Sequence, residues 1–508
     1  MRWKSDDTYC FASFWFLRIL GLAYLSAFLS LWVQLDGLIG SRGILPAQDF
    51  IEAVRNHFGD RLLTEGIWAA PSVFLFGSSD SVLHWGCALG SFLSCLFIIG
   101  FAPNLTALAL WILYLSFTTV AGTFFGFQWD NLLLEMGFLA IFLPPLRVWP
   151  RINHGWRPRT WVLWLYRFLL FRLMFSSGLV KIQPEGAGPN TWADLTALNY
   201  HYETQPLPTL FAWYAHQLPE WFDKISVALT LFIQIVIPFL IFGPRICRRA
   251  ASACLLFLQV LILLTGNYCF FNLLAIGLCL LLLDDRLFQN RLRGWSCKVP
   301  LSTFFGKVAW VKWARGVGGG FLFVVLLSLG VYQLCLTVGV VPAVLKPVAT
   351  LDQIAGPFRT FNTYGLFANM TTSRPEIIVQ GSRDGIEWKD YEFKYKPGDL
   401  SRRPKWNAPH QPRLDWQMWF AALGNVRSSR NQWFLSFLKA LLEGRKEVIG
   451  LLETNPFEDS PPKYVRALVY DYHFTRWGSG DPNWWERGEA SVYCPPVTLD
   501  ESGRLRAQ

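Results

Sequence analysis

Charged residues are scarce in this chain. Asp, Glu, Lys and Arg make up 16% of the 508 residues, whereas hydrophobic residues make up 52% and the mean hydropathy is +0.28. Ordinary soluble domains carry charged residues at about 25% of their positions. The scarcity of charge therefore excludes an ordinary soluble protein and predicts a polytopic α-helical membrane protein.

Several motifs of catalysis and redox chemistry are also missing. The ten cysteines form no Cys-x-x-Cys, and the chain has no phosphate-binding glycine loop, no zinc-protease helix motif and no Gly-x-Ser-x-Gly. These absences argue against thiol–disulfide exchange, a nucleotide-driven pump and a soluble-type hydrolase. We expect no cofactor and no metal site. The net charge of +10 lies in short loops rather than one basic stripe, so we expect no nucleic-acid partner.

Long apolar runs are what the sequence does contain. A bilayer core needs roughly 20 apolar residues in helical conformation, which predicts about nine spans. They lie at residues 11–35, 82–102, 105–125, 131–146, 160–182, 224–243, 250–266, 268–284 and 317–341. Thr265 to Tyr268 reads as the turn of a helical hairpin between two of them.

The loop charges predict an orientation for these spans. With the N-terminus (Arg2, Lys4) in the cytoplasm, the inner loops 147–159, 245–249 and 286–315 hold most of the Lys and Arg. Cytoplasmic loops carry such an excess. Nine spans then place the C-terminal domain outside, in the lumen of the endoplasmic reticulum of a eukaryote or the periplasm of a bacterium.

Charge becomes frequent and mixed in sign after residue 341. This shift predicts two domains: a multi-pass transmembrane domain at 1–341 with an outer loop at 183–223, and an extracytoplasmic soluble domain at 342–508. In the latter, residues 376–380 and 386–395 predict a β-hairpin, 464–474 a strand, and 433–452 two short helices broken at Gly444. We expect an α+β domain built on a small antiparallel sheet.

Ionisable residues inside the spans indicate a structural or functional role, because placing each of them at the centre of a membrane helix costs at least about 2.5–3.5 kcal/mol. Arg18, Glu135, Arg167 and Arg172 occupy such positions. Helical rise places Arg172 within reach of Glu135 on the neighbouring span, so we predict that the two form a pair that locks helices together or belongs to a substrate site. Arg167 and Lys181 lie nearer to membrane edges, where long side chains can snorkel to water.

The outer loop is rich in aromatic and polar residues and has no Lys or Arg between 183 and 223. Two interpretations stay open: a docking surface or cap over the helices, or an aromatic belt at the membrane interface. His201 and Glu203 form only an isolated His-x-Glu, a weak signal for metal. The loop candidates for a functional surface are Asp194, Asn199, Tyr200, His201, Tyr202, Glu203 and Thr204.

The C-terminal domain adds further candidates for a client-binding surface. Its tryptophans could either fill the core or contact a partner, and burial is the commoner role for any one of them. Arg413 and Asp415 are expected to form a structural polar pair. The candidates in this domain are Asn362, Tyr364, Tyr391, Arg413, Asp415, Trp416 and Trp419.

Several long phrases resemble the lipase maturation factor family. They include Leu173-Met174-Phe175-Ser176-Ser177-Gly178-Leu179-Val180-Lys181, the run from Asp194 to Pro208, and Phe361-Asn362-Thr363-Tyr364-Gly365-Leu366-Phe367. The run from Tyr391 to Asp399, that from Arg413 to Ala422, and Asn455-Pro456-Phe457 extend the resemblance to nearly the whole chain. The helical region is also distantly similar to the membrane domain of vitamin K-dependent γ-carboxylases, without a phrase that matches residue by residue.

The resemblance implies a membrane-anchored maturation factor whose partner is an exported client protein. Animal members of the family reside in the endoplasmic reticulum and assist secreted homodimeric lipases. The long basic N-terminal extension and the retention signal of animal members are not evident, which is compatible with a bacterial member whose client need not be a lipase.

The alternative is an integral membrane enzyme that acts on a hydrophobic or lipidic substrate near the outer leaflet. Glu135, Arg172, Lys181, His201 and Glu203 would then converge on a polar cavity. A dry bundle would favour the maturation factor, for which no enzymatic activity is expected.

Overall fold

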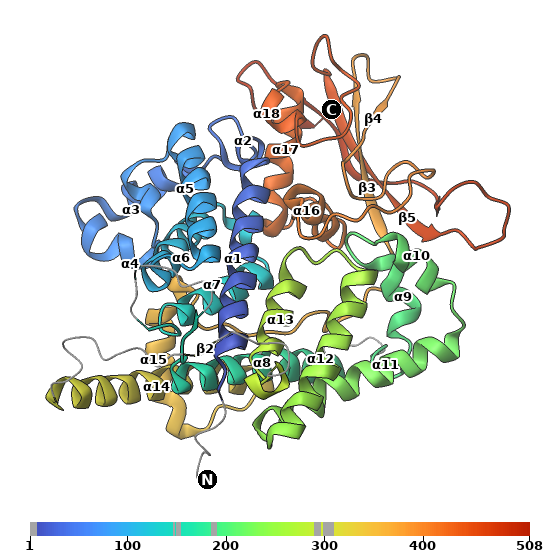
Figure 1. The fold of residues 1–508 in the computed structure, drawn as a ribbon. Coiled ribbons are helices and arrows are strands. Elements are labelled where there is room, and N and C mark those ends of the chain that lie inside the picture. The colour runs from blue at the N-terminus through green and yellow to red at the C-terminus, as the bar shows by residue number, and fades with distance from the viewer. Residues whose placement is uncertain are drawn as a thin grey trace.

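A computed structural model of the chain describes residues 8–145, 148, 154–183, 190–288, 296–297 and 309–507. The predicted inner-loop charges at Arg2, Lys4, Arg147 and Arg151, and those between 291 and 307, lie outside these residues. Figure 1 shows the orange and red segments, from β3 (Pro375–Ser382) onward, gathered at one end of the helical body, with the first residues of α1 (Cys10–Trp32) toward the opposite end.

Seven helices of the described part of the chain are long and apolar enough to cross a membrane. They correspond to seven of the predicted spans. They are α1 (Cys10–Trp32), α5 (Asp80–Ile99), α6 (Pro103–Val120), α8 (Thr160–Ile182), α11 (Glu220–Ile235) with its 3-10 continuation to Phe242, α12 (Arg245–Thr265) and α14 (Ala309–Val338).

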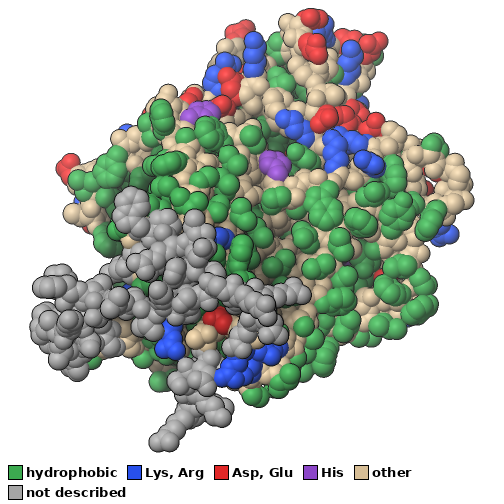
Figure 2. Space-filling model, viewed as in Figure 1, with side chains coloured by type: hydrophobic (Ala, Val, Ile, Leu, Met, Phe, Trp, Pro, Cys, Tyr) green, Lys and Arg blue, Asp and Glu red, His purple; other side chains and the backbone are tan. Residues whose placement is uncertain are grey.

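The other two predicted spans form shorter helices, α7 (Gln128–Ala140) and α13 (Phe271–Leu280). Both are buried on most of their surface, so their length is set by packing against neighbouring helices rather than by the bilayer. The predicted hairpin turn is confirmed, because α12 ends at Thr265 and α13 begins at Phe271. Figure 2 shows hydrophobic side chains over the helical body and charged side chains gathered over the C-terminal end.

Short α-helices lie between the spans and after the last of them. They are α2 (Leu35–Ile39), α3 (Ala47–Phe58), α4 (Ile67–Ala69), α9 (Ala197–Thr204), α10 (Leu210–His216) and α15 (Lys346–Ala355). Helices α9 and α10 lie in the predicted outer loop. Two short parallel strands, β1 (His154–Gly155) and β2 (Ser296–Cys297), pair with each other.

The C-terminal region, residues 342–507, is hereafter called the tail. It contains the predicted antiparallel sheet. The strands follow the order β4-β3-β5-β7-β8, and β6 pairs with β5. They are β3 (Pro375–Ser382), β4 (Lys389–Tyr391), β5 (Tyr464–Phe474), β6 (Trp485–Arg487), β7 (Ser491–Leu499) and β8 (Leu505–Ala507). The predicted hairpin is confirmed by the pairing of β3 with β4, although the second strand is shorter than its alternating pattern suggested.

Three helices cover the tail sheet: α16 (Arg413–Ala422), α17 (Gln432–Leu442) and α18 (Lys446–Ile449). The predicted break at Gly444 is confirmed, since its φ of +65° is a left-handed conformation that favours glycine at a helix end. One continuous cluster of buried apolar side chains includes members of both the helical body and the tail, among them Phe124, Trp129, Trp416 and Trp433. Tail and helices therefore share a core.

Candidate functional site

Buried ion pairs lie where the tail meets the helical body. One of them joins Glu135 on α7 to Arg172 on α8, through direct contact of Oε1 with Nη2. Both side chains are almost completely excluded from solvent. The predicted pair is thus confirmed.

Two tail residues complete the surroundings of Glu135. The hydroxyl of Tyr364 donates to Oε2 at 2.7 Å, and the Asn362 amide lies 3.4 Å from the same atom. Arg172 in turn donates to the backbone carbonyl of Asn362 at 3.0 Å. The pair therefore anchors the first tail segment to two helices, and Tyr364 is a buried structural residue rather than part of a free surface.

A second pair joins Arg413 of α16 to Asp130 of α7. The guanidinium donates to both carboxylate oxygens, at 2.9 and 3.1 Å, and is 1% exposed, while Asp130 is fully buried. Tyr114 donates to Oδ1 of Asp130, and the guanidinium carbon lies 3.4 Å from the centre of the Phe125 ring. Such a bidentate geometry is the strongest form of an Arg–carboxylate contact.

The expected pairing of Arg413 with Asp415 is wrong. Asp415 accepts hydrogen bonds from the backbone N–H groups of Tyr395 and Lys396, at 2.8 and 2.9 Å. Burial raises the pKa of Asp415, while those two hydrogen bonds and the nearby Lys396 ammonium oppose the shift. Residues 413 and 415 lie on different sides of α16, so one faces the helices and the other faces the tail.

A third cluster joins the tail to the outer loop. Arg374 lies 2.7 Å from Glu376 and Lys396 lies 3.1 Å from the same carboxylate, and all three residues are buried. Arg374 also donates to the backbone carbonyls of Glu203, Gln205 and Pro206. The loop that follows α9 is therefore held by a tail arginine.

Glu203 faces the tail and not His201. Its carboxylate accepts from the backbone N–H of Phe474 at 3.1 Å and lies 3.4 Å from His473 and 3.6 Å from His216. Within the described part of the chain, no group of three or more His, Cys, Asp or Glu residues is arranged to hold a metal ion. The His-x-Glu spacing has no role as a ligand pair here.

The predicted surface candidates separate by exposure. Asp194 is exposed, and Asn199, Tyr200, His201 and Asn362 are half-buried. All of the others are interior residues and cannot be offered to a client without unfolding, which corrects their assignment to a surface. They are Tyr202, Glu203, Thr204, Tyr364, Tyr391, Arg413, Asp415, Trp416 and Trp419.

The side chains of Arg167 and Lys181, which are expected to snorkel to water, are also buried. Arg167 lies with its guanidinium carbon 4.7 Å from the centre of the Tyr9 ring and 5.3 Å from that of Trp164. Lys181 is 4% exposed and donates to the carbonyls of Ser177 and Leu366, each at 2.8 Å. Helix packing covers both ends of α8, so neither side chain reaches water.

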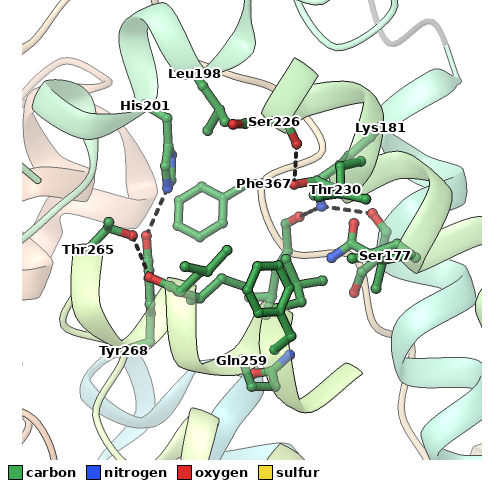
Figure 3. Close-up of a pocket in the computed structure, with 18 of the residues that line it drawn as sticks. Ser177, Lys181, Leu198, His201, Ser226, Thr230, Gln259, Thr265, Tyr268 and Phe367 are labelled. Atoms are coloured by element: carbon green, nitrogen blue, oxygen red, sulfur yellow. Dashed lines mark hydrogen bonds between the residues drawn. The ribbon is translucent and has the colours of Figure 1, made fainter. Parts of the chain in front are cut away.

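Lys181 lines a cavity of about 320 Å³ between α8, α11, α12 and the outer loop. Leu366 and Phe367 of the tail close one side of it. Figure 3 shows Lys181 and His201 on opposite sides of this cavity. The wall is mostly apolar.

His201 has a defined tautomer in this wall. The Gln205 amide nitrogen donates to two carbonyls, so its oxygen accepts the Tyr268 hydroxyl proton at 2.8 Å. Tyr268 must then accept from Nε2 of His201, which lies 3.2 Å away. Burial, together with the Lys181 charge, lowers the pKa of His201 to about 4. The imidazole is therefore neutral at neutral pH.

The five residues of the alternative enzyme hypothesis do not converge. Glu135 and Arg172 pair with each other, and Glu203 faces the tail. Of the five residues, only Lys181 and His201 line the cavity. Sequence reasoning missed Asp130, Arg374, Glu376 and Lys396. Asp130 offered a signal, since it is a carboxylate directly before a predicted span.

Comparisons with known proteins agree with the resemblance seen in the sequence. The family model described as the lipase maturation factor transmembrane domain matches residues 11–290, and that of the lipase maturation factor C-terminal domain matches residues 360–495. Lipase maturation factor 2 of Gallus gallus is 37% identical over 96% of this chain and 81% of its own length.

Other relatives show the same extent of similarity. Lipase maturation factor 1 of Bos taurus is 36% identical over 96% of this chain and 88% of its own, and lipase maturation factor 2 of Homo sapiens is 35% identical over 96% and 82%. No solved structure matches the chain. This integral membrane protein belongs to the lipase maturation factor family.

Proposed function

We propose that this chain promotes the maturation of an exported lipase at the membrane and does so without catalysing a reaction of its own. The observation that carries the proposal is similarity over 96% of the chain to lipase maturation factors 1 and 2, through both the helical and the C-terminal domain. The division of the five polar candidates among separate contacts gives no support to an enzyme.

We place the client at a set of exposed aromatic side chains where the outer loop meets the tail. Trp477 is 71% exposed and its ring centre lies 5.7 Å from that of Tyr214, while Trp406 is 46% exposed and lies 6.3 Å from Phe211. Exposed tryptophan and tyrosine are the side chains that most often dominate binding at protein interfaces. We call these four residues the aromatic rim.

The direct test is complementation in cells that lack their own lipase maturation factors. A secreted homodimeric lipase is expressed with or without this chain, and lipase activity in the medium is measured per amount of lipase protein. The proposal predicts a rise in specific activity. Equal specific activity with and without a membrane-inserted, well-expressed chain would contradict it for that client.

We further propose that the N-terminus is cytoplasmic and that the tail and the outer loop face the lumen or the periplasm, with the endoplasmic reticulum as the compartment in a eukaryotic host. The loop charges support this orientation. Contacts between the outer loop and the tail agree with a common side, such as the bond from Trp419 to the Thr204 carbonyl at 2.8 Å.

Two Asn-x-Thr sites allow the orientation to be tested in a eukaryotic cell. Asn369 lies exposed in the tail, whereas Asn104 is buried and donates to the carbonyls of Ile141 and Pro144. We expect the chain to carry a glycan that is lost in Asn369→Gln and kept in Asn104→Gln, as read from gel mobility after glycosidase treatment. A cytoplasmic tail would leave the protein unglycosylated at Asn369.

A further inference from the structure

The cavity beside Lys181 has the properties of a lipid site. Its volume of about 320 Å³ lies at the lower end of the range of about 300–1,000 Å³ found for small-molecule pockets. Among the described residues the lining includes no Asp or Glu, and its basic group is Lys181, because His201 is neutral. Water is unfavourable in an apolar cavity of this kind, because it finds few hydrogen-bond partners there.

The mouth of the cavity is apolar and exposed. Phe222 and Leu229 of α11 and Phe257 and Leu261 of α12 line it and are 39–50% exposed. Both helices belong to candidate membrane spans. Exposed apolar side chains on such helices contact acyl chains, so the opening faces the hydrocarbon of the bilayer.

The Lys181 side chain places a basic group in the interior of the cavity. The Lys181 ammonium donates to two carbonyls and lies 4.9 Å from the centre of the Trp192 ring, but no carboxylate of the described residues forms an ion pair with it. An ammonium has three donors. A buried, unpaired charge is costly, and an anion supplied by a ligand would remove that cost.

The wall also restricts what the anion can be. A phosphate head group is usually held by several donors or by an arginine fork, and the lining has one lysine and no arginine. An extended peptide would bring backbone amide groups that this wall cannot satisfy. A small anionic head on one flexible chain fits both the single charge and the volume.

We propose that this cavity binds a long-chain fatty acid anion, with the carboxylate on Lys181 and the chain between α8, α11 and α12. Two further polar side chains of the wall, Gln234 and Gln259, lie on α11 and α12. The proposal is independent of the client, because the aromatic rim contributes no residue to the lining.

The test uses the full chain in phosphatidylcholine nanodiscs with radiolabelled palmitate as the probe and empty nanodiscs as the blank. Hexadecanol, which has the same chain length but no charge, serves as the competitor. We expect palmitate to bind at least about tenfold more tightly than hexadecanol. Equal competition by the alcohol, or displacement of all palmitate by the phosphatidylcholine already present, would overturn the proposal.

Two variants locate the site. Lys181→Met keeps the length of the side chain and should abolish the preference for palmitate, whereas Lys346→Met, at an exposed lysine of α15, should not change it. Thr230→Trp should fill the cavity and weaken both ligands. Should Lys181→Met fail to fold, the comparison of palmitate with hexadecanol on the unaltered chain still decides. Palmitate binding unchanged by both Lys181→Met and Thr230→Trp would contradict the assignment.

Discussion

Buried positive charges occur in two different settings in this molecule. Where the tail meets the helices, Arg172, Arg374 and Arg413 each contact a buried carboxylate. On the wall of the cavity, Lys181 has two carbonyl acceptors and no acid among the described residues. The difference separates a junction whose charges are paired within the chain from a cavity that we propose to be completed by a fatty acid.

The junction consists of charge pairs for which removal of one partner is costly. Breaking a buried pair leaves the other charge unpaired and typically costs 3–5 kcal/mol, whereas replacing both partners by apolar groups is often close to neutral. Paired charges thus fix the position of the tail more than they stabilise the fold. This role suits the client surface that we propose where the outer loop meets the tail.

The largest effect is expected for Arg413→Met. The substitution leaves Asp130 buried with only Tyr114 as a donor side chain, so we expect a loss of about 3–5 kcal/mol in the free energy of unfolding. Thermal denaturation of the detergent-solubilised chain, followed by size exclusion, measures it. The matched control is Arg42→Met, because Arg42 pairs with Glu447 across the same junction at 3.7 Å but is 59% exposed. That control should change stability by at most about 1 kcal/mol.

A smaller loss is expected for Arg172→Met. Glu135 keeps the hydrogen bond from Tyr364 and the amide of Asn362, so about 2–3 kcal/mol is expected rather than the full cost of an orphaned carboxylate. The same denaturation assay measures it, with Tyr364→Phe as a companion at about 1–2 kcal/mol. The Arg413–Asp130 pair is thus expected to be the more costly to break. A loss in the free energy of unfolding for Arg172→Met that equals or exceeds that of Arg413→Met would contradict this order.

Acid should destabilise the chain through two histidines. Burial lowers the pKa of both His201 and His410 to about 4, with contributions from Lys181 and from Arg413 and Lys394 respectively. The unfolded chain, with histidine pKa near 6.5, binds more protons between pH 6.5 and 4, so stability falls as the pH falls through this window.

We expect these histidines to account for about 1–2 kcal/mol of that loss, since His410 is only partly buried. Denaturation midpoints at pH 7 and pH 5 measure it for the unaltered chain and for His201→Gln and His410→Gln. Variants as sensitive to acid as the unaltered chain would show that other groups carry the effect.

The smallest effect on stability is expected at the aromatic rim. Trp477→Ala and Trp406→Ala remove exposed rings, so the free energy of unfolding should change by no more than about 0.5 kcal/mol. The specific activity of the co-expressed lipase should nevertheless fall. The control is Trp221→Ala, at a tryptophan of α11 outside the rim whose exposure of 63% lies between those of Trp406 and Trp477. Unchanged lipase maturation in both rim variants would remove the rim as the client surface.

The sequence predicted those features that depend on local pattern. Apolar run length found all the span helices, strand-like runs found β3 and β5, and Gly444 marked a helix break. The Glu135–Arg172 pair could be predicted because each charge interrupts an apolar run and adjacent spans bring the two together.

Long-range partners could not be predicted in this way. Asp130 and Arg413 are 283 residues apart, and nothing in either local sequence points to the other. The short lengths of α7 and α13 depend on burial by neighbours, and the cavity is lined from segments spread between Leu173 and Phe367. The outer-loop residues Tyr202, Glu203 and Thr204 are predicted as surface from their local sequence, although the structure buries their side chains.

The coupling between Arg413 and Asp130 tests most directly whether tail and helices are held as one unit. The measurement is a double-mutant cycle on the full chain, with Arg413→Met, Asp130→Asn and the combination compared by denaturation. We predict that the double variant loses at least about 1.5 kcal/mol less than the sum of the single losses. Additive losses would contradict the account, because the two charges would then not stabilise each other across the junction.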